Sequence, residues 1–164
     1  MQSSRTKGGA SMRPEVFVII HVVFGMFGIL AALWMFVETL NSSETNQKRI
    51  EIASVILVCC MWLSYVLGGY YYVNYYAASK AVILAGPFPS AHKFFMEVKE
   101  HLFFMILLLA TYAPFAVYGE KLYGNKGAKN LVLAVSALVV VLGLVMDGSG
   151  AMIIMGEKMG LLRR

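Results

Sequence analysis

The stretch VFVIIHVVFGMFGILAALWMFV, from Val16 to Val37, contains a single ionisable side chain, His21. A helix of about 20 apolar residues crosses the hydrocarbon core of a bilayer, so this stretch is long enough to span it. It is too long for the apolar part of a signal peptide, and no small-residue cleavage pattern follows it. We therefore expect a membrane-spanning helix that begins at Pro14, a residue suited to the first turn.

Three further apolar runs are long enough, or nearly long enough, to span a bilayer, and 59% of the chain is hydrophobic while 14% is charged. Such a composition is typical of integral membrane proteins and not of soluble domains. The runs are Ile52 to Val73, Leu102 to Tyr118 and Leu131 to about Met155. Ser90 precedes the run that begins at Leu102 and is a suitable N-cap for its helix. The sequence predicts an all-α, integral membrane four-helix bundle of up-down-up-down topology, a single transmembrane domain over residues 1–164 with helices at about 14–40, 51–76, 90–118 and 130–156.

Basic residues in the flanks of the runs predict the orientation in the membrane. The positive-inside rule places the side with more lysine and arginine in the cytoplasm. One side has nine and the other has five: Arg5, Lys7, Arg13, Lys80, Lys93, Lys99, Lys158, Arg163 and Arg164 against Lys48, Arg49, Lys121, Lys126 and Lys129. We expect a multi-pass protein of the cell's inner (plasma) membrane with both termini cytoplasmic. The net charge of +5 then belongs to the membrane surface, and nucleic acid is not an expected partner.

Several kinds of chemistry have no motif in the sequence. A phosphate-binding loop, a nucleophile elbow and a CxxC pair are all absent, so hydrolytic and nucleotide-driven reactions are not expected, and no catalytic residue is assigned. Cys59 and Cys60 are adjacent within an apolar run, which favours small packing residues over a disulfide framework. A redox-active or metal-binding pair is the alternative for them.

Polar residues gather at the end of the bundle where the first and third helices begin. His21 lies about 12 Å along its helix from Arg13, and His101 about 16 Å along its helix from Ser90, at about 1.5 Å per residue. The second and fourth helices bring Asp147, Glu157 and the tyrosines of the Tyr70 to Tyr76 cluster to the same end. Ionisable groups inside a membrane usually face the bundle interior or a watery cavity, so this end is the expected site, although an aromatic interface belt also explains the tyrosines.

The stretch SAHKFFMEVKEHLFFM, from Ser90 to Met105, carries two of the three histidines. Helical spacing places Glu97 and His101 on one face, which we expect to point into the bundle toward His21. On the His21 face, Gly25 and Gly28 leave a flat surface. That surface is either a seam for a neighbouring helix or a groove for the edge of a planar cofactor.

These features resemble small four-helix transmembrane b-type cytochromes. The resemblance rests on His21 and His101 at matched depth in parallel helices, with glycines beside His21. It implies one haem b with these two histidines as axial ligands, Glu97 orienting an imidazole, and Lys80, Lys93 and Lys99 near the propionates. It also implies electron exchange with quinone or with a partner redox protein. Members of that family often hold two haems on four histidines, whereas this chain has three histidines.

Two other interpretations stay open. The side chains of His92, Glu97, Glu100 and His101 could bind non-haem iron or zinc, because mixed nitrogen and oxygen ligands suit these metals. The position of His92 argues against this metal site, because His92 is expected on nearly the opposite face of the helix from His101. The last interpretation is a cofactor-free accessory subunit of a larger membrane complex, because the loops leave no room for a soluble catalytic domain.

Overall fold

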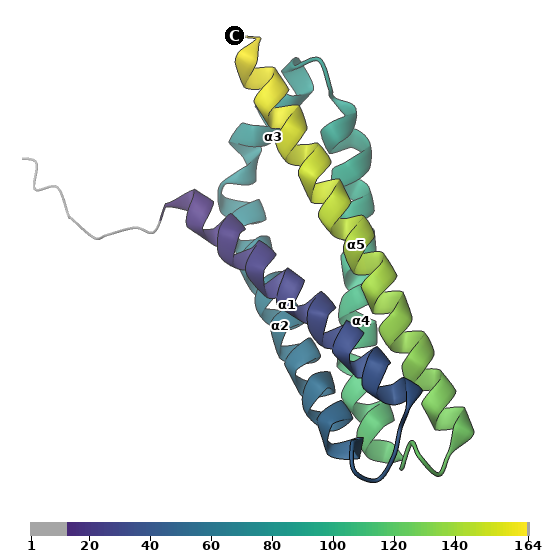
Figure 1. The fold of residues 1–164 in the computed structure, drawn as a ribbon. Helices are drawn as coiled ribbons and strands as arrows, with labels where there is room; N and C mark the ends of the chain where they lie inside the picture. Colours follow the sequence, from purple (N-terminus) through teal and green to yellow (C-terminus); the bar gives the residue numbers. More distant parts are fainter. Residues whose placement is uncertain (1–12, 164) are drawn as a thin grey trace, which may run out of the picture.

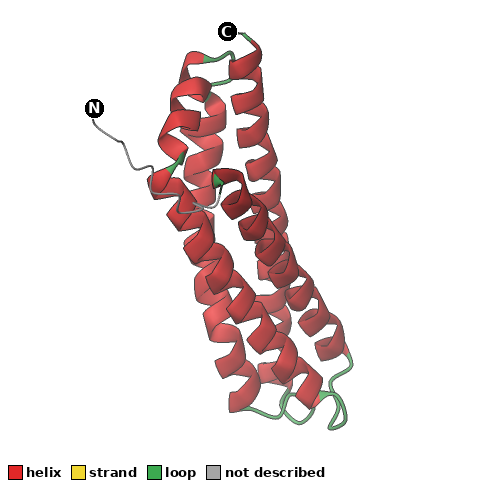
Figure 2. Ribbon diagram, turned by 90° about the vertical axis from the view of Figure 1, so that its left-hand side faces the viewer, coloured by secondary structure: helices red, strands yellow, loops and turns green. Residues whose placement is uncertain are grey.

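The computed structural model describes residues 13–163, which form helices joined by short loops without a strand in that range (Figure 2). The predicted all-α class is confirmed. In chain order the elements are α1 (Pro14–Leu40), α2 (Gln47–Asn74), α3 (Tyr76–Ala85), the π-helical turn η1 (Ala91–Met96), α4 (Glu97–Gly119) and α5 (Lys126–Leu162).

Four segments are long and apolar enough to cross a membrane. They are α1, α2, the continuous unit of η1 and α4, and α5, and their most apolar windows have a mean hydropathy between 1.9 and 2.7. Their outward faces carry large apolar side chains, with Leu108 and Phe115 each 72% exposed. A contiguous apolar exterior of this kind requires lipid or protein around it. The expected multi-pass membrane bundle is therefore what the chain builds.

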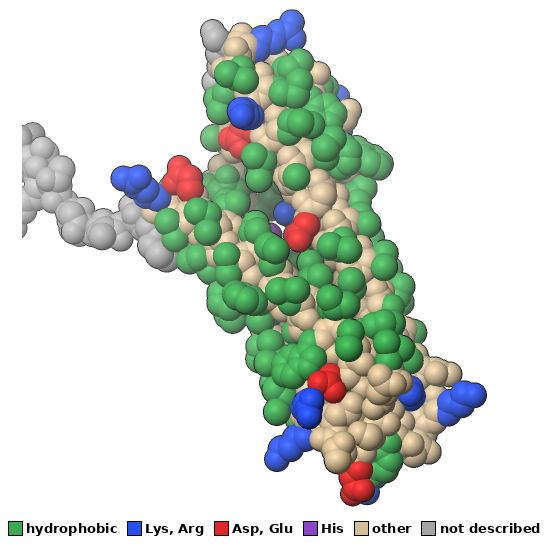
Figure 3. All heavy atoms as spheres, in the orientation of Figure 1, with side chains coloured by type: hydrophobic (Ala, Val, Ile, Leu, Met, Phe, Trp, Pro, Cys, Tyr) green, Lys and Arg blue, Asp and Glu red, His purple; other side chains and the backbone are tan. Residues whose placement is uncertain are grey.

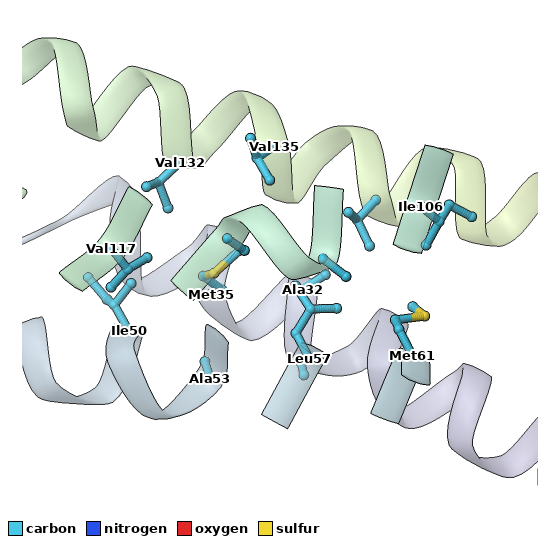
Figure 4. Packing of buried hydrophobic residues seen from close by; sticks show 14 of the residues in the cluster. Ala32, Met35, Ile50, Ala53, Leu57, Met61, Ile106, Val117, Val132 and Val135 are labelled. Atoms are coloured by element: carbon cyan, nitrogen blue, oxygen red, sulfur yellow. The ribbon is translucent and has the colours of Figure 1, made fainter. Parts of the chain in front are cut away.

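The four long helices form a ring in which α1 and α4 are diagonal to each other. Helix α1 packs against α2 and α5, and α4 packs against the same two helices, whereas no Cα atom of α1 lies within 8 Å of one of α4 in the described chain (Figure 1). Side chains from all four fill the centre, including Met35, Leu57, Val117 and Val135 (Figure 4). Close packing of this kind fixes the order of the helices around the ring.

The loops at the lower end of Figure 1 are tied together by hydrogen bonds. Asn46 accepts a bond from the Ser43 amide at 2.7 Å and donates to the Glu38 carbonyl at 3.0 Å. Gln47 donates to the carbonyl of Val117 at 3.2 Å and accepts from the Leu122 amide at 3.1 Å. The α1–α2 and α4–α5 loops are thus held at one level, which marks one face of the membrane.

The other end of the molecule is longer than predicted. Helix α5 has 37 residues, or about 56 Å at about 1.5 Å per residue, and extends well beyond the start of α1 (Figure 1). Helix α3 and η1 pack against this extension around Tyr76, Ile83 and Ile153. The predicted helices, 51–76 and 90–118, leave the residues between them as a connection, whereas the structure places a ten-residue helix there, which ends at Gly86 before Pro87.

The start of α1 and the end of α5 both lie away from the two tied loops, toward the same end of the bundle (Figure 1). Arg5, Lys7 and Arg164, which entered the charge count, lie outside the described residues.

Candidate functional site

His21 lies on the face of α1 that packs against α2. Its Nδ1 atom is 2.8 Å from the carbonyl oxygen of Ser64 and 2.9 Å from the Ser64 hydroxyl. A carbonyl oxygen only accepts, so Nδ1 carries a proton, and in the neutral ring Nε2 keeps its lone pair. Gly68 makes room for the ring, because a Cβ atom there would lie 2.6 Å from Nδ1.

The glycines beside His21 do not open a groove. A Cβ atom at Gly28 would lie 2.7 Å from the Met61 side chain, and one at Gly25 would lie 3.4 Å from the Ser64 hydroxyl. Side chains of α2 therefore fill the space in which the edge of a planar cofactor was expected. This is the geometry of a small-residue seam between two helices.

Lys99 is half-buried between α4 and α5, whereas the prediction placed it near haem propionates. It belongs to the same face of α4 as the buried Ile106 and Ala110, and its Nζ atom would be 3.3 Å from a Cβ atom at Gly150 of α5. Gly150 is one helical turn from Asp147, so the Lys99 ammonium lies beside the part of α5 that carries Asp147, and its charge also acts on His21 of α1. The structure thus brings together a histidine, a lysine and an aspartate from three helices.

These three residues, here called the His–Lys–Asp cluster, lie where α1 separates from α5. Ile29 packs closely against Gly143, and beyond this contact α1 leans away from α5 (Figure 1). Figure 3 shows a hollow between the two helices with a basic, a histidine and an acidic side chain at it. In the described part of the chain the ion pair of Arg49 with Glu38, at 3.3 Å, is the only one, so Lys99 and Asp147 form no ion pair.

His101 and Glu97 share a face of α4, as predicted, but that face is turned away from the bundle. Both side chains are exposed, and they line a shallow groove with Phe94, Val98 and Leu102. The expectation that they point toward His21 is wrong, because two residues along a helix rotate a side chain by about 200° and Lys99 occupies the inward face. A single haem held between His21 and His101 of one chain does not fit this arrangement.

The alternative metal ligands are also apart. His92 is 3.1 Å from the hydroxyl of Tyr76, and Glu100 is exposed on α4. In residues 13–163 no three side chains of His, Cys, Asp or Glu are grouped closely enough to hold a metal ion. Burial raises the pKa of the Tyr76 phenol, which therefore keeps its proton well into the alkaline range. The predicted set of His92, Glu97, Glu100 and His101 is not assembled in one place.

The tyrosines at the end of α2 form aromatic contacts. Tyr70 lies 4.9 Å from Phe17 between ring centroids, and Tyr72 stacks on Tyr76 at 5.1 Å. Such pairs stabilise the joint between α1, α2 and α3. Cys59 is exposed and Cys60 is half-buried, and both are free thiols.

Comparison with known protein families, with curated proteins and with solved structures finds no match to this chain. The resemblance to b-type cytochromes stays a prediction made from two histidines. Functional reasoning depends on the site itself.

Proposed function

We propose that this protein binds the polar end of a membrane-soluble ligand at the hollow between α1 and α5. The observation that carries the proposal is the meeting of His21, Lys99 and Asp147 there without a direct ion pair between Lys99 and Asp147. Lysine and aspartate are rare within membrane-spanning helices, and those that persist usually mark ligand or ion sites.

Each member of the His–Lys–Asp cluster offers a different bond to a ligand. The Lys99 ammonium has three N–H donors, the Asp147 carboxylate only accepts, and the Nε2 atom of a neutral His21 accepts as well. Lys99 makes no hydrogen bond to another described residue, so its donors are available in the hollow. A ligand with both an acceptor and a donor in its polar end fits these three groups.

A ligand-dependent shift in thermal unfolding tests this proposal. The full chain in detergent is unfolded with and without an added extract of polar membrane lipids, and the change in Tm is the readout. We expect the extract to raise Tm for the native chain and for Lys93→Met, an exposed lysine of η1, but not for Lys99→Met. An equal rise in Lys99→Met contradicts the proposal, whatever the Tm of that variant without lipid.

We keep haem-based electron transfer as a second proposal, on one observation. The Nδ1 atom of His101 donates to the Glu97 carbonyl at 2.7 Å, so Nε2 is left free toward the outer groove. Metal-bound histidines usually have this arrangement, with the other ring nitrogen donating to a carbonyl. The partner across the groove would be another membrane subunit, and quinone or a redox protein would exchange electrons with the complex.

A reduced-minus-oxidised visible spectrum of the protein in native membranes tests this second proposal. Supporting data are a b-type haem spectrum lost in His101→Ala and kept in His21→Ala. A colourless protein contradicts it.

For the cellular location we propose the inner (plasma) membrane with cytoplasmic termini. The support is the excess of basic residues on the side of the termini, which is eight against five once the inward-facing Lys99 is left out.

A further inference from the structure

We infer that the ligand of the hollow is a zwitterionic phospholipid with a phosphoethanolamine headgroup, its phosphate on Lys99 and its ammonium on Asp147 and His21. This inference rests on the ligand site proposed above and names its ligand.

The depth of the cluster matches the level of lipid headgroups. Asp147 lies 18 residues along α5 from Lys129, a distance of about 27 Å at about 1.5 Å per residue. Lys129 itself is fixed at the opposite end of the bundle, where its Nζ atom donates to the Leu40 carbonyl at 2.8 Å. On α1, His21 is 17 residues from Glu38, or about 26 Å. A hydrocarbon core of about 30 Å therefore ends close to the level of both residues.

The hollow opens sideways and not only along the axis of the bundle. Figure 3 shows it on the lateral face between α1 and α5, surrounded by apolar side chains. Asp147, Gly148 and Ala151 of α5 are exposed at this level. A membrane lipid can thus place its headgroup at the cluster while its acyl chains stay in the bilayer.

The charges favour a headgroup with both signs. Lys99 and Asp147 have opposite charges on different helices, and they do not neutralise each other in an ion pair. An anionic headgroup would meet Lys99 but would also approach the Asp147 carboxylate. A zwitterion satisfies both residues, because its phosphate binds the ammonium and its own ammonium binds the carboxylate.

Hydrogen-bonding capacity favours ethanolamine over choline. A primary ammonium has three N–H donors, whereas a trimethylammonium has none. The acceptors on the protein side are the Asp147 carboxylate and the Nε2 atom of His21, which is free because Nδ1 is held by Ser64 at 2.8 Å. These two acceptors favour a headgroup whose ammonium donates hydrogen bonds, which is ethanolamine and not choline.

Native mass spectrometry of the full chain with three lipids of identical acyl chains tests the inference. The probes are phosphatidylethanolamine, phosphatidylcholine and phosphatidylglycerol, added in equal amounts. We expect the native chain to bind phosphatidylethanolamine about tenfold more tightly than the other two, which corresponds to about 1.4 kcal/mol. Lys99→Met should lose this binding about tenfold, Asp147→Asn should lose the preference over phosphatidylglycerol, and Lys93→Met should behave as the native chain.

The outcomes separate the inference from the site on which it rests. If phosphatidylcholine or phosphatidylglycerol binds as tightly as phosphatidylethanolamine and Lys99→Met still loses the lipid, the headgroup assignment is overturned while the site stands. If no lipid binding depends on Lys99, both are overturned. Circular dichroism of each variant checks that the helices are retained.

Discussion

At the scale of single residues, Gly68 sets the position of His21. A Cβ atom at Gly68 would lie 2.6 Å from Nδ1 and 2.8 Å from Cε1 of the ring. We predict that Gly68→Ala forces the ring away from Ser64 and lowers the free energy of unfolding by about 1–3 kcal/mol, as overpacking does. The loss should appear as a lower Tm in detergent.

Gly69→Ala is the matched control, because a Cβ atom at that neighbouring position meets nothing within 4 Å. Its Tm should stay equal or rise, since alanine is favoured over glycine inside a helix by about 0.5–1 kcal/mol. Equal losses in the two variants would argue against the contact between Gly68 and His21.

The sequence predicted that His21 is an embedded polar residue, but it did not predict which residues of α4 meet it. Counting from His101 gives Met105 and Leu108, and counting from Lys99 gives Phe103 and Ile106, so both faces look equally apolar. Lipid tails are as apolar as a protein core, and hydrophobicity therefore does not distinguish the outward face of a membrane helix from the inward one.

At the scale of elements, α3 and η1 escaped prediction for different reasons. The run YAASKAVILA of α3 is too short to span a membrane, so a search for spans leaves it between two predicted helices. The π-helical turn of η1 has an ordinary helical sequence, AHKFFM, and no pattern that separates it from an α-helix. Because a π turn contains extra residues, it rotates every later side chain relative to α-helical counting.

Helix α3 depends on a glycine of α5. A Cβ atom at Gly160 would lie 2.6 Å from the carbonyl oxygen of Val82, and this backbone atom does not move as a side-chain tip does. We predict that Gly160→Ala displaces α3 from α5 and lowers local stability there by about 1–3 kcal/mol. Hydrogen exchange should become faster in the amides of α3 and stay unchanged at the core positions Leu57 and Val139.

Gly148→Ala serves as the control for this change, since nothing lies within 4 Å of a Cβ atom at Gly148. Its exchange pattern should match that of the native chain. Faster exchange throughout the bundle in Gly160→Ala would show that α3 is not a separate unit of stability.

At the scale of the whole molecule, the number and approximate bounds of the spans were predictable. Length and hydropathy decide them, and the predicted first helix, 14–40, has the bounds of α1. The order of helices around the ring was not predictable, because it depends on close contacts such as Ile29 against Gly143. That order makes α1 and α4 diagonal and turns His101 outward, which separates the two histidines on which the haem prediction relied.

The lysine and arginine residues in the flanks of the spans predict the orientation of the protein in the membrane. With cytoplasmic termini, the α1–α2 and α4–α5 loops face the outside. In a chain whose Cys59 and Cys60 are replaced by alanine, we expect Glu44→Cys and Gly124→Cys to react with a membrane-impermeant maleimide in intact cells. Lys158→Cys, exposed near the other end, should react only after the membrane is opened. The reverse pattern would invert the orientation. Three spans separate Glu44 from Lys158: α2, η1 with α4, and α5. An odd number of spans places the two residues on opposite sides of the membrane, so labelling of Glu44→Cys and Lys158→Cys from the same side would contradict the topology.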